Sequence, residues 1–187
     1  LFVSRQAKGR ALSVDYREAD AMDAIRDVCL RSASLAILRF PDRYERSLLS
    51  LLKRKELASE IICRFELSVL MSERHSLAAA SLLTADLLEQ SVEVICEDTS
   101  LADYLNEAAE PEHFPSSIRL HEGVGLCGLL SHMTASFAFA PPLPEAVLRE
   151  YHLVQKKYQG PPRKMTDMLI YPQDARLSRT ENALHGT

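Results

Sequence analysis

A glycine-rich hexapeptide is the part of this sequence that most resembles a chemical site. Residues 123–128 read Gly-Val-Gly-Leu-Cys-Gly and match the pattern G-x-G-x-x-G. In a dinucleotide site such glycines let the backbone approach a pyrophosphate at the start of a helix. That interpretation requires a βαβ unit of about 30 residues. One short strand is expected at residues 117–121, but Ala140 runs into Pro141 and Pro142, so no second strand is predicted.

Two interpretations of the hexapeptide therefore stay open. Close packing of helices at small residues accounts for the glycines without any ligand. The alternative is a nucleotide-dependent enzyme that uses Gly123, Gly125 and Gly128.

The cysteines and histidines do not have the spacing of a metal or redox site. The four cysteines, at positions 29, 63, 96 and 127, are each more than 30 residues apart, and no C-x-x-C pair exists. His121-Glu122 begins an H-E-x-x-H pattern, but the second histidine is absent. The sequence therefore predicts reduced thiols, no metal ligand, no cofactor and no catalytic residue.

Composition indicates a folded chain without a membrane span. The 187 residues are 47% hydrophobic, and the net charge is −4. That charge counts against nucleic-acid binding, because phosphate neutralisation requires basic residues. The most apolar stretch, residues 126–142, is interrupted by polar side chains and is expected to be a buried helix.

An internal repeat sets the expected fold. Residues 47–63 and 81–96 share a Ser-Leu-Leu start and an acidic–aliphatic–Ile-Cys end, offset by 33 or 34 positions. Helix-breaking segments follow each cysteine: 41–42, 72–76, 110–115 and 141–144. A period of this length is typical of stacked helical hairpins.

The apolar spacing between breakers is interpreted as helical. Leu57, Ile61, Phe65 and Val69 recur at intervals of four, which places them on one face of a helix. We therefore expect an all-α, short right-handed solenoid of about 3–4 helical hairpins. The expected units are 15–41, 42–75, 76–110 and 115–141, with a capping helix at 144–158 in which Pro144 takes an early position and Glu145 lies in the first turn.

The two ends differ from the expected repeat. Residues 1–14 are basic and carry no acid, which matches the end of a cleaved mitochondrial targeting segment; an ordinary start of the ordered chain is the alternative. Residues 159–187 are expected to form an extended tail. Its apolar residues could lie back on the array or dock onto a partner protein, and the proposed docking residues are Met168, Leu169, Ile170 and Tyr171.

A family resemblance gives the functional hypothesis. Residues 44–52, followed by Glu56 and Ala58, resemble a pentatricopeptide unit, and the resemblance extends over 42–110. The whole chain resembles the pentatricopeptide-like accessory subunit of the catalytic head of euglenozoan mitochondrial ATP synthases. That resemblance implies a non-enzymatic matrix protein that binds catalytic-head subunits and takes no nucleotide, nucleic acid or small-molecule substrate. A short pentatricopeptide RNA-binding or mitoribosome-associated protein is the alternative.

Overall fold

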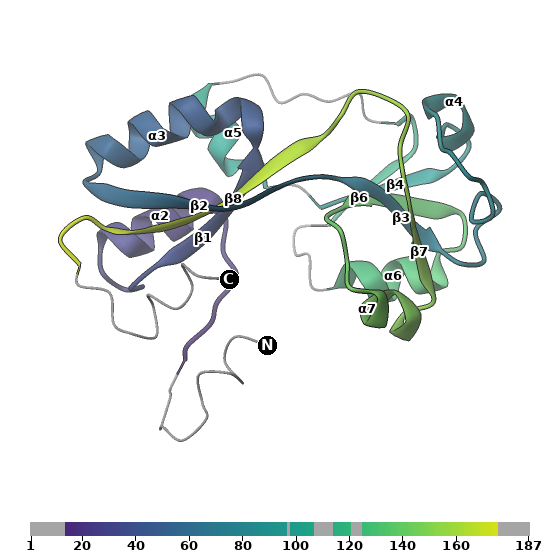
Figure 1. The fold of residues 1–187 in the computed structure, drawn as a ribbon, viewed down its shortest axis with the longest axis horizontal. Helices are drawn as coiled ribbons and strands as arrows, with labels where there is room; N and C mark the ends of the chain where they lie inside the picture. The colour runs from purple at the N-terminus through teal and green to yellow at the C-terminus, as the bar shows by residue number, and fades with distance from the viewer. Residues whose placement is uncertain (1–13, 97, 107–113, 121–124, 176–187) are drawn as a thin grey trace.

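The computed structural model shows an α/β protein with two lobes. It describes residues 14–96, 98–106, 114–120 and 125–175. Figure 1 shows the lobes side by side, with long strands crossing the middle of the molecule between them. One sheet has three strands in the order β1-β8-β2, and the other has five in the order β5-β4-β6-β3-β7. We call the lobe with the three-stranded sheet lobe A and the other lobe B.

The predicted all-α solenoid is wrong. Strands β2 (Leu57–Glu66), β3 (Ser68–Ser72) and β4 (Val92–Ile95) run through the region that was expected to hold two helical hairpins. The physical reason is an ambiguity of spacing. Residues four apart share a face in a helix, but they also share a face in a strand, whose side chains alternate with period two.

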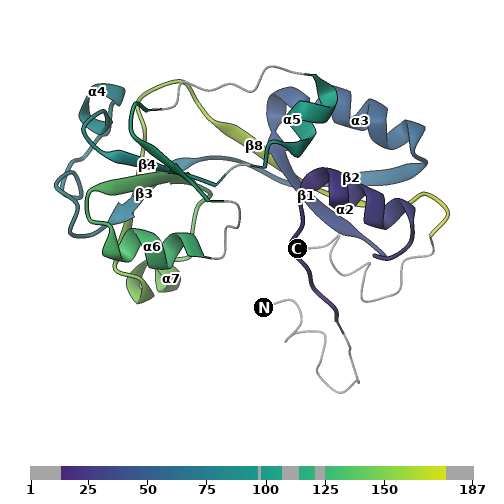
Figure 2. The same cartoon turned by 180° about the vertical axis from the view of Figure 1, so that it is seen from behind.

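Lobe A is a sheet with helices on one face. Strands β1 (Ala36–Pro41) and β2 both pair antiparallel to β8 (Lys164–Pro172), which lies between them. The helices are α2 (Ala21–Cys29), the 3₁₀ turn η1 (Asp42–Tyr44), α3 (Glu45–Arg54) and α5 (Ser100–Leu105). Figure 2 shows α2, α3 and α5 from behind, gathered around this sheet.

The core of lobe A follows from two periodicities. Helix α3 buries Leu48, Leu51 and Leu52, which lie three and four apart on one helical face. Strand β1 buries Leu38 and Phe40, two apart and hence on one side of the sheet. These side chains form one buried cluster with residues of α2, α5 and β8.

Lobe B has apolar cores on both faces of its sheet. Its further elements are α4 (Ala85–Leu88), β5 (Ser117–Arg119), α6 (Leu126–His132), β6 (Ser136–Ala140), α7 (Glu145–Glu150) and β7 (Leu153–Lys156). Along β6, Phe137 packs into one cluster, while Ala138 and Ala140 pack into the cluster on the other face. A strand buried on both faces is apolar at consecutive positions. The sequence pattern of residues 136–140 therefore resembles that of a buried helix, which is the wrong prediction here.

The expected repeat units therefore do not exist as helical hairpins. Unit 42–75 contains a helix and two strands, and unit 115–141 contains β5, α6 and β6. The expected capping helix at 144–158 divides into α7 and β7, although α7 does begin directly after Pro144. Cys63 lies on β2 and Cys96 follows β4 in the other lobe, so the similar sequence around them reflects no structural repeat.

The ends are placed only in part. Residues 1–13 and 176–187 lie outside the described residues, so the basic arm and the last part of the tail remain predictions. The rest of the expected tail contains β8, the middle strand of the lobe A sheet. Within the described ranges, no helix combines the length and the apolar character that a membrane span requires.

Candidate functional site

Most strands of both lobes point their carboxyl ends at the junction between the lobes, while β3 and β8 begin there. Strand β2 continues into β3 through Leu67, so β2 ends at the junction and β3 begins there. Strand β1 runs antiparallel to β8, which starts opposite Glu66, and therefore ends there as well. In lobe B, β6 ends opposite Ser68 and β4 and β5 run parallel to it. Ligands of open α/β sheets bind outside the carboxyl ends of strands, which makes this junction the candidate site.

The same chain directions place helix N-termini at the junction. Helix α3 follows the end of β1, and α7 follows the end of β6, so both begin there. Helix α2 runs into β1 and therefore also begins at that end. The first N–H groups of a helix lack intrahelical acceptors and carry partial positive charge. The junction is thus suited to oxygen-rich, anionic groups.

The N-terminus of α2 is held by a segment that leaves lobe B. The Asp98 carboxylate accepts a hydrogen bond from the Ala21 N–H at 2.6 Å, and the Ser100 hydroxyl accepts one from the Met22 N–H at 3.3 Å. These residues follow β4, a lobe B strand, yet α5 packs on α2 in lobe A. A carboxylate from the chain itself therefore occupies the place where an external anion would be expected.

A polar network lies at the start of α3. The Arg64 guanidinium donates to the two carboxylate oxygens of Glu45 at 2.6 and 3.0 Å, and to the Thr166 hydroxyl at 3.1 Å. The Thr166 hydroxyl donates in turn to Asp42 at 2.5 Å. The hydrogen bond from Arg64 holds the pKa of Glu45 below its usual value, so the Glu45–Arg64 pair stays ionised near neutral pH.

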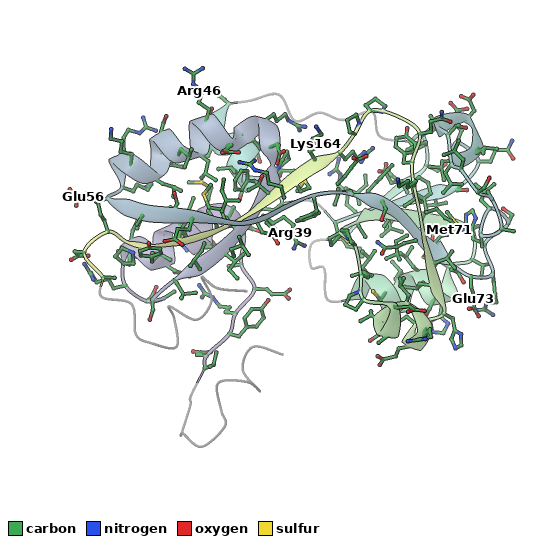
Figure 3. All side chains as sticks on the ribbon, viewed as in Figure 1. Arg39, Arg46, Glu56, Met71, Glu73 and Lys164 are labelled. Carbon is green, nitrogen blue, oxygen red and sulfur yellow. The ribbon has the colours of Figure 1, made fainter. Side chains whose placement is uncertain are left out.

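Basic side chains lie at the end of the segment 157–163, which connects β7 in lobe B to β8 in lobe A. Arg163 and Lys164 lie where the chain passes from β7 to β8. Lys164 is exposed, and the structure records no hydrogen bond or ion pair for it among the described residues. Figure 3 shows Lys164 near the middle of the molecule, at the lobe A end of the crossover. It is therefore an exposed cation at the junction.

The glycine hexapeptide is only partly placed. Gly123 lies outside the described residues, Gly125 precedes α6 and Gly128 lies within that helix. The βαβ unit that was missed does exist, because β5 and β6 both run parallel to β4, with α6 between them. The packing interpretation fails at Gly125 and Gly128, since a Cβ at either would meet no atom within 4 Å.

The cysteines do not form a site. Cys29 and Cys63 are exposed in lobe A, while Cys96 and Cys127 are half-buried in lobe B. Burial raises the pKa of the Cys96 and Cys127 thiols, which keeps them protonated and unreactive. Within the described ranges, no group of three or more His, Cys, Asp or Glu side chains has the arrangement of a metal site.

The proposed docking residues are part of the lobe A sheet. Met168, Leu169 and Ile170 are at most 1% exposed, and the Tyr171 hydroxyl donates to Glu60 at 3.0 Å. Their packing is therefore explained within the chain. Docking of these residues onto a partner protein remains an untested prediction.

Two surface hollows lie away from the junction. One, of about 350 Å³, lies where α2, α3 and β8 end in lobe A and includes Arg31 and Asp174. The other, of about 470 Å³, lies at the distal end of lobe B and includes His75. The His75 ring is buried, its Nδ1 accepts from the Leu77 N–H, and no partner is recorded for its Nε2 among the residues that the structure describes. Burial lowers the pKa of His75.

The two-lobed α/β fold is shared with several solved structures. The effector-binding domain of QuiR, in complex with shikimate, matches with a TM-score of 0.65 at 16% identity, over 98% of this chain and 85% of that one. Full-length OxyR from Pseudomonas aeruginosa matches with a TM-score of 0.64 at 11% identity, over 98% of this chain and 60% of that one. The regulatory domain of MetR, a LysR family regulator from N. meningitidis, matches with a TM-score of 0.52 at 13% identity, over 87% of this chain and 71% of that one.

These identities show a shared fold and no more. No protein-family model and no curated protein matches the sequence. The chain therefore has the fold of a LysR-type effector-binding domain.

The likeness overturns the identity expected from the sequence. The similar structures are α/β regulatory and effector-binding domains, not helical-repeat subunits of an ATP synthase or pentatricopeptide RNA-binding proteins. The expected mitochondrial location is also wrong, since the relatives with a stated source are bacterial. The sequence predicted that the partners are subunits of a large complex and that no small molecule binds. That prediction is contradicted, because the similar QuiR domain was solved with shikimate. As regulatory domains, the relatives agree with the expectation of a non-enzymatic protein.

Proposed function

We propose that this chain is a ligand-sensing domain that binds a small anionic organic molecule at the junction between its lobes. The observation that carries the proposal is that the carboxyl ends of the strands in both lobes meet at one junction. Binding sites are preferentially located at such places between lobes. The likeness to an effector-binding domain solved with shikimate supports the same assignment.

The chemistry of the junction favours a carboxylate ligand with hydroxyl groups. The N-terminus of α3 supplies N–H donors, since that of α2 is occupied by Asp98, and Lys164 supplies a cation for which no internal partner is recorded among the described residues. Asp42, Glu45 and Thr166 supply acceptors and a hydroxyl for the polar remainder of such a ligand. We also propose that the domain binds its ligand without catalysing a reaction. The similar structures that support this are an effector-binding domain and a regulatory domain.

The domain would act within a transcription regulator. Similar structures include a LysR family regulator and a putative LysR family transcriptional regulator. The net charge of −4 suits a part that does not itself contact DNA. Retention of the isolated chain on heparin at moderate salt would contradict that division of roles.

A ligand screen tests the proposal. Shikimate and other small hydroxylated carboxylates are titrated into the protein and followed by thermal shift and calorimetry. A true ligand raises the melting temperature in proportion to the logarithm of its concentration. Lys164→Gln should weaken its binding by about tenfold or more, the loss expected for one charge-assisted hydrogen bond.

The control is Lys53→Gln, which removes a lysine from the end of α3 that is distant from the junction. Its affinity should equal that of the wild type. The proposal fails if no anion binds, or if the two lysine variants lose affinity equally.

A further inference from the structure

We propose that the outward face of α3 docks a second copy of this chain, through the exposed segment of residues 14–20, which we call the leading segment. The contact pairs acidic side chains of the leading segment with cations on α3. No ligand takes part in it, so the inference is independent of the proposed function.

The outward face of α3 is basic. Four exposed cations lie on the helix or directly after it: Arg46, Lys53, Arg54 and Lys55. The structure records no side-chain hydrogen bond or ion pair for these four residues among those that it describes. The acid of the helix, Glu45, receives two hydrogen bonds from Arg64 and does not neutralise the face. The four charges are therefore available to a partner.

Helical spacing places charge and an apolar side chain on the same side of α3. The helix buries three leucines in the lobe A core, and Arg46 and Lys53, seven positions apart, lie on the opposite side. Leu49 is beside them and is 41% exposed. Figure 3 shows Arg46 pointing away from the rest of lobe A. Such a face favours an acidic partner that also presents an apolar side chain.

The leading segment has this complementary character. All seven of its residues are exposed, and none is in a helix or strand. Val14 and Tyr16 are large side chains that are 51% and 78% exposed. Three carboxylates accompany them, those of Asp15, Glu18 and Asp20. The segment thus combines negative charge with apolar surface that its own chain leaves uncovered.

The charge of the leading segment is not cancelled by its own cation. Arg17 forms an ion pair with Asp27 of α2, and Asp20 makes no capping hydrogen bond to that helix. Seven extended residues span up to about 23 Å, whereas the ten residues of α3 span about 15 Å. The leading segment is therefore long enough to lie along the whole helix.

The two surfaces meet between copies and not within one. The leading segment runs directly into α2, which is packed in the core of lobe A. Figures 1 and 2 both show the segment leaving the bottom of lobe A, whereas α3 lies at the top. A second copy is therefore needed to bring the acids of a leading segment to the cations of α3.

Sedimentation equilibrium of the full chain tests the contact. At low salt the average mass should rise above that of a monomer as the concentration increases, and high salt should suppress the association because it screens exposed charges. Arg46→Glu with Lys53→Glu should weaken the association by about tenfold or more, since each reversal turns an attraction into a repulsion. Asp15→Lys with Glu18→Lys should have the same effect.

Mixing the two reversed chains distinguishes a direct contact from a change in overall charge. Each reversed chain should associate weakly with itself, but the two should associate with each other, because the reversed segment then meets the reversed helix face. The matched control is Arg149→Glu with Lys157→Glu, which makes the same change in net charge at exposed residues outside lobe A. It should leave the association at its wild-type strength.

A further set of replacements accounts for the basic residues that precede the leading segment. Arg5, Lys8 and Arg10 carry the same sign of charge as the face of α3. Replacing all three by Gln should therefore strengthen the association, and a weaker association would contradict the inference.

A second variant covers a failure of the reversed α3 chain to fold. Arg46→Gln with Lys53→Gln removes the two charges without reversing them and should weaken the association by a smaller factor. A chain that stays monomeric at low salt overturns the inference. An association that survives both reversals, or reversed chains that do not bind each other, overturns it equally.

Discussion

The hydrogen bond from the Ala21 N–H to Asp98 leads to a quantitative prediction. Asp98→Ala removes the acceptor that satisfies the first N–H group of α2. The residue before that helix, Asp20, makes no side-chain capping bond of its own. The replacement therefore leaves an N-terminal donor of the helix without a protein partner, at the junction that we propose as the ligand site.

The magnitude follows from two contributions. Loss of a capping side chain costs about 0.5–2 kcal/mol, typically about 1. Loss of a negative charge beside a helix N-terminus costs about 0.3–1 kcal/mol more. Asp98→Ala should therefore lower the free energy of unfolding by roughly 1–2 kcal/mol, and Asp98→Asn, which keeps an acceptor oxygen, by only about 0.3–1 kcal/mol.

Urea unfolding followed by circular dichroism measures the free energy, and hydrogen exchange of α2 locates the effect. For a chain of this size the loss of 1–2 kcal/mol corresponds to a fall of roughly 2–8 °C in melting temperature. Asp103→Ala is the matched control, because that exposed aspartate in the first turn of α5 has no recorded side-chain hydrogen bond or ion pair among the described residues and should lose only the helix-dipole contribution of about 0.3–1 kcal/mol. The reasoning is refuted if Asp98→Ala matches this control, or if Asp98→Asn is as costly as Asp98→Ala.

Three further predictions concern lobe B. Phe137 is fully buried and packs edge-on against Phe114 at 5.1 Å, so Phe137→Ala should cost about 3–5 kcal/mol in denaturant unfolding, and Phe137→Leu clearly less. In the folded state, burial lowers the pKa of His75 from its ordinary value of 6.5. As the pH falls, the unfolded chain therefore binds a proton at this histidine before the folded chain does, and the free energy of unfolding should decrease below about pH 6.5. His75→Asn should reduce this decrease, measured as the melting temperature at several pH values. Gly128 lies inside α6 with open space around it, so Gly128→Ala should stabilise by about 0.5–1 kcal/mol, and a destabilisation would show that the glycine is needed for another reason.

Some local features were predictable because they depend on neighbouring residues. Proline at 144 marked the start of α7 at Glu145, since proline is tolerated at the beginning of a helix. The short strand expected at residues 117–121 exists as β5.

The candidate site depended on information that local patterns do not carry. Spacings of four along β2 fit a helix and a strand equally, so nothing local excluded the solenoid. The strand β6 was missed because both its faces are buried, and its run of apolar residues has no alternation. Because β6 was not predicted, the βαβ unit of β5, α6 and β6 was not predicted either.

The sequence by itself determined the start of α7 after Pro144 and the absence of metal-ligand spacing among its cysteines and histidines, because each can be decided from residue types and their separation alone. Tertiary structure decided that β8 enters the sheet between β1 and β2, more than 90 residues beyond β2. It also brought Asp98 to the start of α2 and Arg163 to Glu93. Such long-range pairing is selected by the burial of whole faces against each other, and no short stretch of sequence contains that information.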